Sequence, residues 1–295
     1  MIVVKIWGGF GNQLFQYAFG YALAKRNGQQ LLLDLSFYTE RANREPLIRL
    51  CNLEFSEEKK DQQYNKNIHR YQHSSLYRFY SKLCSILGLG TFLFVPEKEP
   101  RYLSHLKSIT PKPYTFLEGY WQTSLYFDEF RQSLKKQFVP KVTSNAIGLL
   151  GEQIRSEPSI ALHVRRGDYL KFTKSPSEND SLYLLDASYF HDAITQMLLL
   201  IPNGIIYCFS DDIPWCKQEF KMYPIIYMDP DPQRNDVEEW FLMSQCQHHI
   251  VSNSSFSWWA AYVNNNPQKI ILRPSRWFGN HDIYPSEWIE IPLRG

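Results

Sequence analysis

The second half of this 295-residue chain alternates short β-prone runs with longer runs of helical length. The short runs cover residues 160–164, 205–209, 225–228, 249–251 and 269–272. The longer runs cover residues 187–200, 237–246 and 256–263. Strands and helices that alternate at this spacing predict an α/β fold with a doubly wound parallel sheet.

Polar side chains follow three of these predicted strands directly. Arg165 follows the first predicted strand. Residues 210–212 (SDD) follow the second, and residues 252–255 (SNSS) follow the fourth. In a doubly wound sheet, ligands bind outside the carboxyl ends of the strands. The three clusters therefore predict a nucleotide site on one edge of the sheet.

Arg165 is the leading candidate among these side chains, and it opens the sequence RRGD at 165–168. A guanidinium group stays charged, and its planar fork matches phosphate oxygens in pairs. A flexible glycine beside it suits a diphosphate that must be held and later released. The alternative is a surface turn with a solvated ion pair.

The N-terminal segment predicts a strand, a loop, a helix and a second strand. Apart from Lys5, residues 2–6 are β-branched and apolar, and GGFG at 8–11 breaks the strand. Asn12 suits a helix N-cap, and residues 31–33 indicate a short buried strand. Glycines at a helix start let backbone N–H groups approach a phosphate. A dinucleotide fingerprint and a tight turn without ligand are the alternatives. The fingerprint lacks its third glycine, where Leu14 stands, although Asp34 lies about where a ribose-binding acid is expected.

Two further features allow both a structural and a binding interpretation. Ser254, Ser255 and Ser257 open a predicted helix, where one serine would suffice as a cap and the others could bind phosphate. His163 shares a strand face with Arg165, so it is either a core residue or a phosphate contact.

Metal sites have weak support in the sequence. Asp229 and Asp231 have the D-x-D spacing that can hold a divalent ion on a sugar diphosphate, but prolines follow both and favour a solvated turn. The pair at 248–249 (HH) has no further ligands nearby.

Composition excludes several classes of protein. A net charge of +2 gives no global field for nucleic acid. Five cysteines without a C-x-x-C pair argue against a disulfide framework and a zinc cluster, and they fit a reducing cytosol. No apolar run approaches the roughly 18 residues of a membrane span, and the N-terminus lacks a signal-peptide pattern.

Three segments together resemble the bacterial α-1,2-fucosyltransferases of glycosyltransferase family 11. They are GFGNQLFQYA at 9–18, HVRRGD at 163–168, and LMS at 242–244 with NSSFSWW at 253–259. Weaker support comes from GYWQ at 119–122 with YF at 126–127, and from FSDD at 209–212. Two places depart from the family pattern: AAY at 260–262 replaces Gly-Ala-Trp, and Glu239-Trp240 replaces an Asp–Met pair.

The resemblance implies a GT-B architecture, with two Rossmann-like domains facing across a cleft. Residues 1–150 would form a mainly acceptor-side domain with an irregular helical insertion at about 40–110. Residues 151–295 would form the domain that binds GDP-fucose.

The resemblance also implies a set of site residues and no metal requirement. The expected donor-binding residues are Gly9, Phe10, Gly11, Asn12, His163, Arg165, Ser210, Asp211, Asn253, Ser254, Ser255, Phe256 and Ser257. The expected catalytic residues are Arg165, Asp168, Asn12 and His163, and the expected acceptor-side residues are Glu118, Trp121, Gln122 and Tyr169. Asp168 is the first candidate for the catalytic base, with orientation of the arginines as its alternative role and Glu118 and His163 in reserve.

The implied activity is an inverting transfer of L-fucose from GDP-fucose to O-2 of a terminal β-galactoside, in O-antigen or surface-polysaccharide assembly. The acceptor glycan would be free or lipid-linked, and the enzyme cytoplasmic, either free or peripheral at the inner membrane. The alternatives are a fucosyltransferase of other linkage or acceptor, and a non-catalytic module that binds a nucleotide sugar or a glycan.

Overall fold

The computed structural model describes residues 1–40, 45–57, 92–171, 183–277 and 282–293, together with residues 74, 76, 79, 83 and 90. The chain forms two compact units. The first comprises Met1–Gly8, Gln13–Pro46 and Glu54–Phe130, and the second comprises Gly9–Asn12, Leu47–Leu53 and Arg131–Gly295. All residues from Arg131 onward belong to the second unit. The boundary between the two units therefore lies at an earlier residue than the expected boundary between 150 and 151. Much of the expected insertion at about 40–110 lies outside the described residues, and the acceptor and donor roles of the two domains stay predictions.

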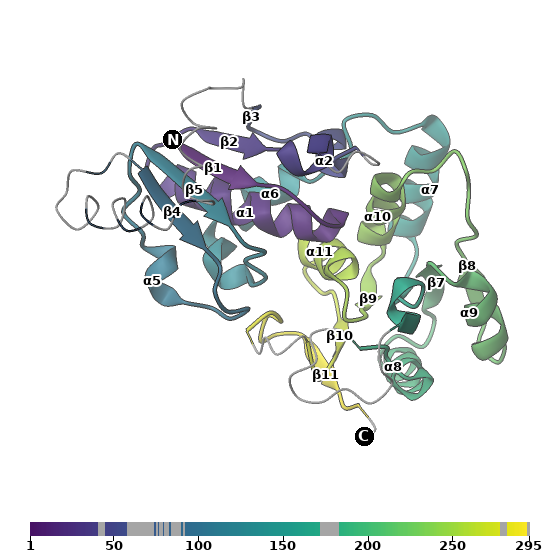
Figure 1. Ribbon diagram of the computed structural model, residues 1–295. Helices are drawn as coiled ribbons and strands as arrows, with labels where there is room; N and C mark the ends of the chain where they lie inside the picture. Colours follow the sequence, from purple (N-terminus) through teal and green to yellow (C-terminus); the bar gives the residue numbers. More distant parts are fainter. Residues whose placement is uncertain are drawn as a thin grey trace. The chain divides into compact units, whose positions relative to one another are not determined.

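A parallel sheet forms the centre of the first unit (Figure 1). Its strands lie in the order β3-β2-β1-β5-β4, and every neighbouring pair is parallel. The strands are β1 (Ile2–Lys5), β2 (Leu31–Asp34), β3 (Ser56–Glu57), β4 (Phe92–Pro96) and β5 (Tyr114–Glu118). The predicted N-terminal strand–helix–strand unit is therefore confirmed.

Helix α1 (Phe10–Arg26) packs against this sheet. A Cβ added at Gly20 would lie 2.2 Å from Cγ2 of Val4, so this glycine lets the helix approach β1 closely. The prediction that Asn12 caps the helix is wrong, because the helix begins at Phe10 and Asn12 lies in its first turn. The other described helical elements of this unit are α2 (Ser36–Glu40), α5 (Ser104–Lys107), η2 (Ser124–Tyr126) and η3 (Asp128–Phe130).

The second unit is built on a six-stranded parallel sheet in the order β11-β10-β9-β6-β7-β8. The strands are β6 (Ser159–Val164), β7 (Ile205–Ser210), β8 (Ile225–Tyr227), β9 (His248–Ile250), β10 (Ile271–Pro274) and β11 (Ile289–Ile291). Counted along the chain, this is the 3-2-1-4-5-6 order of a doubly wound dinucleotide-binding fold. The order reverses between β6 and β9.

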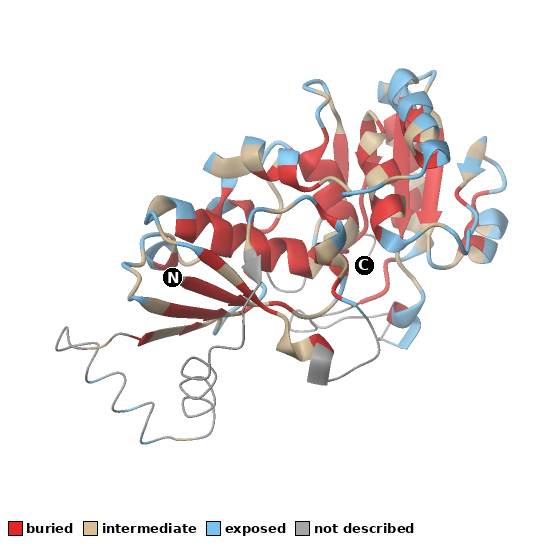
Figure 2. Cartoon of the chain, turned by 90° about the horizontal axis from the view of Figure 1, so that it is seen from above, coloured by how far each residue is buried: buried red, intermediate tan, exposed pale blue. Residues whose placement is uncertain are grey.

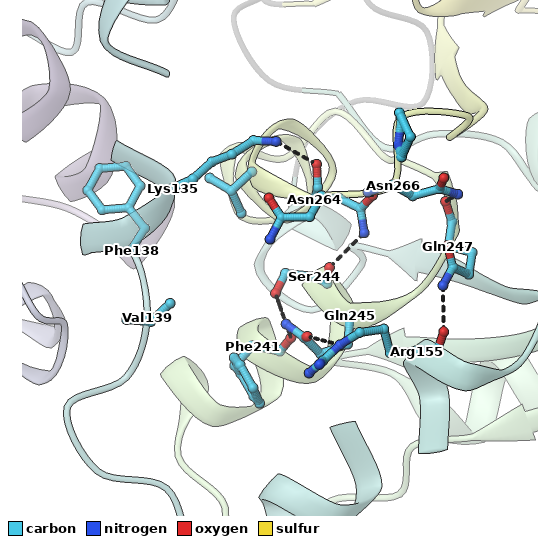
Figure 3. Close-up of a pocket in the computed structure, with 13 residues that line it drawn as sticks. Lys135, Phe138, Val139, Arg155, Phe241, Ser244, Gln245, Gln247, Asn264 and Asn266 are labelled. Atoms are coloured by element: carbon cyan, nitrogen blue, oxygen red, sulfur yellow. Dashed lines mark hydrogen bonds between the residues drawn. The ribbon is translucent and has the colours of Figure 1, made fainter. Parts of the chain in front are cut away.

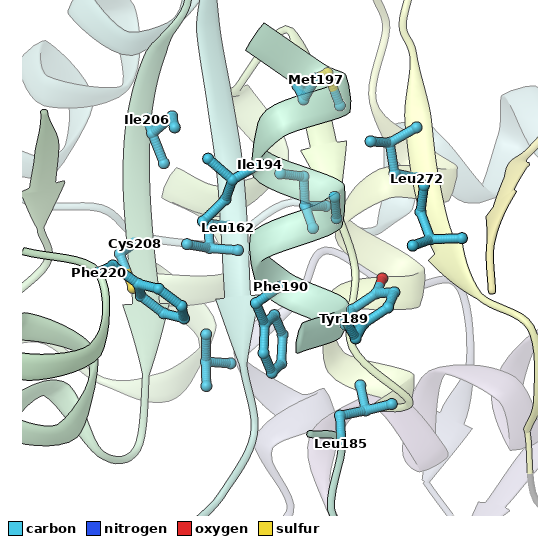
Figure 4. Packing of buried hydrophobic residues seen from close by; sticks show 14 of the residues in the cluster. Leu162, Leu185, Tyr189, Phe190, Ile194, Met197, Ile206, Cys208, Phe220 and Leu272 are labelled. Atoms are coloured by element: carbon cyan, nitrogen blue, oxygen red, sulfur yellow. The ribbon is translucent and has the colours of Figure 1, made fainter. Parts of the chain in front are cut away.

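Helices cover both faces of this sheet. Alternate side chains of each strand point to opposite faces, so apolar strands such as β6 need a covering layer on each side. On one face, Leu162 of β6 packs with Phe190 and Ile194 of α8 (Ala187–Leu200) and with Phe220 beyond α9 (Ile213–Glu219), as Figure 4 shows. Elsewhere α7 (Asn145–Ser156) packs on β6, and α10 (Asp236–Gln245) packs on β7 and on α11 (Ser255–Val263). Figure 2 shows the strands of both sheets largely buried, with exposed residues on the outer sides of the helices. The short helical elements of this unit are η1 (Leu47–Leu50), α6 (Arg131–Gln137) and η4 (Asp168–Lys171).

The predicted elements of the second half are present. The five predicted strands are observed within two residues at each end, and α8 has the predicted bounds. The strand β11 was not predicted. No described helix combines the length and the apolar content needed to cross a bilayer.

Candidate functional site

The polar clusters predicted to meet at one sheet edge do so in the second unit. Residues 165–168 follow β6, residues 211–212 follow β7, and residues 251–254 follow β9, and these three strands are neighbours in a parallel sheet. The strand order reverses between β6 and β9, where doubly wound folds bind their ligands.

Arg165 is held between two carboxylates at the end of β6. Its Nη1 lies 3.0 Å from Oδ2 of Asp211, and its Nη2 lies 3.0 Å from Oδ1 of Asp168. Burial lowers the pKa of Arg165, but the two carboxylates outweigh that effect and raise it above its ordinary value. The side chain is 36% exposed. The guanidinium is therefore charged, oriented and open to a ligand.

Asp211 ties the ends of β6 and β7 together. Besides the ion pair with Arg165, its Oδ1 accepts a hydrogen bond of 2.8 Å from the backbone N–H of Arg166. A Cβ added at Gly167 would lie 2.8 Å from Oδ2 of Asp211. The glycine of the RRGD segment therefore leaves room for this carboxylate.

Arg166, unlike Arg165, is bound to side chains that follow β7. Its guanidinium lies 3.8 Å from the centre of the Trp215 ring, and its Nε lies 3.2 Å from Oδ2 of Asp212. Its side chain is only 15% exposed. Trp215 was not predicted, although the Asp212 N-cap of α9 was a local signal for this turn.

His163 is buried, and its environment keeps it uncharged. Its Nδ1 shares a hydrogen bond of 2.8 Å with Oγ of Ser252, which joins β6 to the segment after β9. Burial, assisted by the charge of Arg165, lowers the pKa of His163 to about 3. The histidine thus has a partner within the fold, and contact with phosphate stays a prediction.

Tyr169 and Asn253 connect the arginine to the serine-rich loop. The Tyr169 hydroxyl donates to the Asn253 carbonyl at 3.3 Å, and the Tyr169 ring centre lies 5.8 Å from the Arg165 guanidinium. Asn253 is fully buried, and its Nδ2 donates to the Tyr183 carbonyl at 2.9 Å. Tyr169, expected on the acceptor side, thus lies in the second unit beside Arg165.

The three serines at the start of α11 have different hydrogen-bond partners. Ser254 caps α11 by accepting from the N–H of Phe256, and the Ser257 hydroxyl donates to the Ser254 carbonyl at 3.2 Å. Ser255 donates to Oδ1 of Asn12 at 2.8 Å. Ser210 Oγ accepts from the N–H of Asp212 at 2.9 Å.

The first turns of α1 and α11 touch within the second unit. A Cβ added at Gly11 would lie 2.3 Å from the carbonyl carbon of Ser255, whereas one added at Gly9 would meet nothing within 4 Å. The Phe10 ring packs edge-on against Trp240 and Phe256, with ring centroids 5.4 and 6.4 Å apart. Two helix N-termini, each carrying a positive partial charge, therefore lie side by side.

The remaining acceptor-side candidates belong to the first unit. Glu118 ends β5 and pairs with Lys5 at 2.6 Å. Trp121 is fully buried, with its ring centroid 4.5 Å from that of Phe19, and Gln122 is half-buried. Contact of these side chains with an acceptor stays a prediction.

The candidate metal ligands have other partners. Asp229 pairs with Lys217 at 2.7 Å, and Asp231 accepts from the N–H of Gln233 at 2.9 Å. Among the described residues, no group of three His, Cys, Asp or Glu side chains could hold a metal ion.

A cavity of about 520 Å³ lies at the opposite, amino-terminal edge of the second sheet (Figure 3). Its polar side chains mostly bind one another and the nearby backbone. Asn264 Nδ2 donates to the Ser244 carbonyl at 2.9 Å, and Arg155 Nε donates to Oε1 of Gln245 at 3.0 Å. The cavity is separate from the strand ends that carry Arg165.

Comparison with known proteins assigns the chain to a family. The profile of Glycosyl transferase family 11 matches residues 100–292. An Alpha-1,2-colitosyltransferase of Escherichia coli is 30% identical over 305 residues, which cover 99% of each chain. The chain therefore belongs to glycosyl transferase family 11.

Other relatives of this glycosyltransferase extend the comparison. The O-antigen biosynthesis glycosyltransferase WbnK of Escherichia coli is 28% identical, over 96% of this chain and 98% of WbnK. Galactoside 2-alpha-L-fucosyltransferase Sec1 of Mus musculus is 22% identical, over 99% of this chain and 74% of Sec1. The predicted family is confirmed.

Solved structures confirm the predicted GT-B type of fold. A variant of Arabidopsis thaliana FUT1 in complex with GDP superposes with a TM-score of 0.58 at 17% identity, over 92% of this chain and 69% of that one. Fucosyltransferase NodZ from Bradyrhizobium superposes with a TM-score of 0.52 at 15% identity, over 88% of this chain and 91% of NodZ.

Because the first turns of α1 and α11 are in contact, we predict that an added side chain destabilises the protein at Gly11 but not at Gly9. Gly11→Ala places its Cβ against backbone atoms of α11, so we expect a loss of about 1–3 kcal/mol in the free energy of unfolding. Gly9→Ala meets open space and is expected to stay within about 0.5 kcal/mol of the original. Urea unfolding of both variants measures the difference, and equal stability would contradict the described packing.

Proposed function

We propose that this family 11 glycosyltransferase transfers L-fucose from GDP-fucose, with inversion and without a metal ion, to O-2 of a terminal β-galactoside. The near full-length matches to an Alpha-1,2-colitosyltransferase and to an O-antigen biosynthesis glycosyltransferase support the linkage and a role in O-antigen assembly. The match to a galactoside 2-alpha-L-fucosyltransferase supports the acceptor sugar.

The observation that carries the proposal is the accessible guanidinium of Arg165 at the point where the strand order reverses. A diphosphate brings several negative charges, which a guanidinium fork and two adjacent helix N-termini can balance. As the fucosyl bond breaks, the β-phosphate gains charge. Each preorganised contact to such a charge contributes roughly 3–4 kcal/mol to catalysis. In the proposal this charge compensation takes the place of a metal ion.

When the donor binds, its diphosphate would replace one of the two carboxylates that pair with Arg165. Asp211 is 26% exposed and also accepts from the backbone N–H of Arg166, whereas Asp168 is 56% exposed. The diphosphate would therefore displace Asp168 and leave Asp211 in place. A released Asp168 carboxylate could then accept the proton of the attacking hydroxyl. The alternative is that Asp168 serves only to orient Arg165.

The other candidate bases are less suited to this step. His163 is uncharged, but it is buried and bonded to Ser252. Glu118 is paired with Lys5. Asp168 is therefore the base that the proposal names.

One comparison favours a second donor. The relative at 30% identity is a colitosyltransferase, and colitose is L-fucose without its 3-hydroxyl. A site at Arg165 that binds the diphosphate of the donor would serve either sugar. The donor test must therefore include GDP-colitose.

We further propose a cytoplasmic location, free or peripheral at the inner membrane, and an acceptor glycan that is free or lipid-linked. Cys51, Cys208, Cys216 and Cys246 are buried free thiols. Unpaired cysteines are typical of a reducing compartment.

Transfer can be tested directly with purified protein, GDP-fucose and a panel of β-galactosides in EDTA. The expected result is GDP release that requires the acceptor, with a new α-1,2 linkage in the product by NMR. Activity that EDTA abolishes and Mn²⁺ restores would contradict metal independence. GDP binding without transfer to any acceptor of the panel would point to a different acceptor or to a binding module.

The base assignment predicts a large effect of one conservative substitution. Asp168→Asn is expected to lower kcat by about 10²- to 10⁴-fold, because an amide cannot accept the proton, while GDP affinity is kept. Asp231→Asn is the control, since an asparagine can keep the turn that Asp231 forms with Gln233. A decrease in kcat of less than about tenfold for Asp168→Asn would assign that residue an orienting role.

A further inference from the structure

The first unit has its own point of strand-order reversal, between β1 and β5. Its strands lie in the order β3-β2-β1-β5-β4, all parallel, with the first strand of the chain in the middle (Figure 1). The rule that points to Arg165 in the second unit applies here as well: a ligand is expected outside the carboxyl ends of the two strands that flank the reversal. The segments that leave these ends are 6–8 and 119–121.

Two aromatic rings and an ion pair occupy these strand ends. The Trp7 and Tyr120 ring centroids are 5.2 Å apart, with an angle of 46° between the ring planes. Lys5 Nζ lies 5.8 Å from the Trp7 ring centre and 2.6 Å from Oε1 of Glu118. Tyr120 is 37% exposed, and the Lys5 and Glu118 side chains are 23% and 29% exposed. The four side chains therefore form a partly open surface, hereafter the aromatic platform.

The turn that presents Tyr120 is fixed from the neighbouring strand. Glu97, which follows β4, accepts hydrogen bonds from the backbone N–H groups of Tyr120 at 2.6 Å and of Trp121 at 3.0 Å. Trp121 has a φ of 57°, which is strained for a bulky residue. A Cβ added at Gly119 would lie 2.3 Å from Cβ of Glu97. Strained residues that the surroundings hold in place are concentrated at binding sites.

The platform has the chemistry of a site for a neutral sugar. Because O-4 of galactose is axial, its C3–H, C4–H and C5–H bonds lie on one face, and this apolar face can stack on aromatic rings. The Lys5 ammonium can donate to ring hydroxyls, and the Glu118 carboxylate can accept from them. Since the two charges balance, the platform has no net attraction for an anionic sugar.

We infer that Trp7, Tyr120, Lys5 and Glu118 form a subsite for the terminal β-galactoside, with Glu97 as a positioning residue for Tyr120. This inference rests on the proposed function for the identity of the sugar. Neither Trp7 nor Tyr120 was among the acceptor residues expected from the sequence. Trp121, which was expected, supports the turn from inside the core.

The test uses the full chain with Tyr120→Leu, Tyr120→Phe and Trp7→Leu, and Leu125→Ala as a matched control at an exposed apolar residue of the same unit. Saturation-transfer NMR with methyl β-D-galactopyranoside measures sugar contact without the donor. Steady-state kinetics measures the KM values of acceptor and donor. Tyr120→Leu and Trp7→Leu should each raise the acceptor KM about tenfold or more and weaken the NMR contact, with the GDP-fucose KM unchanged. Tyr120→Phe keeps the aromatic ring and should raise the acceptor KM less than Tyr120→Leu does, whereas Leu125→Ala should resemble the original protein.

The outcomes separate this inference from the proposed function. An unchanged acceptor KM in both leucine variants of an active enzyme would overturn the subsite and leave the fucosyl transfer intact. Loss of acceptor and GDP affinity together would indicate structural damage and would also overturn it. NMR contact that both leucine variants lose, in a protein that transfers fucose to no galactoside, would support the subsite while the proposed function fails.

Discussion

The carboxylate of Asp211 holds the candidate donor site together. It binds the guanidinium of Arg165 and the backbone N–H of Arg166, so the chain leaving β6 is tied to the chain leaving β7. Gly167 leaves room for this arrangement, because a Cβ there would lie 2.8 Å from Oδ2 of the same carboxylate. The arginine is therefore oriented before any ligand arrives, and a preorganised charge of this kind is what stabilisation of a departing diphosphate needs.

The same topological constraint operates in each unit separately. Parallel strands bring their carboxyl ends to one edge, and a reversal of strand order opens a place for a ligand there. In the second unit this place carries an arginine and two helix starts, which suit phosphate. In the first unit it carries two aromatic rings and a balanced ion pair, which suit a neutral sugar. The two proposed substrates differ in the same way, because the donor carries a charged diphosphate and the acceptor is a neutral sugar.

Local sequence patterns predicted the elements that are continuous and buried, and missed those that depend on distant contacts. The α8 helix was predicted with its observed bounds because its apolar residues recur regularly, and the structure shows that Asp186 caps its start. The strand β11 was missed because two of its three residues are exposed. The start of α1 was misplaced because Phe10 packs against Trp240 and Phe256, far along the chain. Glu97 gave no signal either, since its role is visible only from its bonds to the turn after β5.

The most direct test of the central claim compares GDP with GMP, which lacks the β-phosphate, by calorimetry. The original protein should bind GDP more tightly than GMP. Arg165→Ala should lower GDP affinity by about 10- to 100-fold, change GMP affinity little, and so remove the preference. Arg155→Ala, at the opposite edge of the sheet, should keep the preference for GDP over GMP. An undiminished preference for GDP in Arg165→Ala would contradict the account, because the diphosphate would then be held elsewhere.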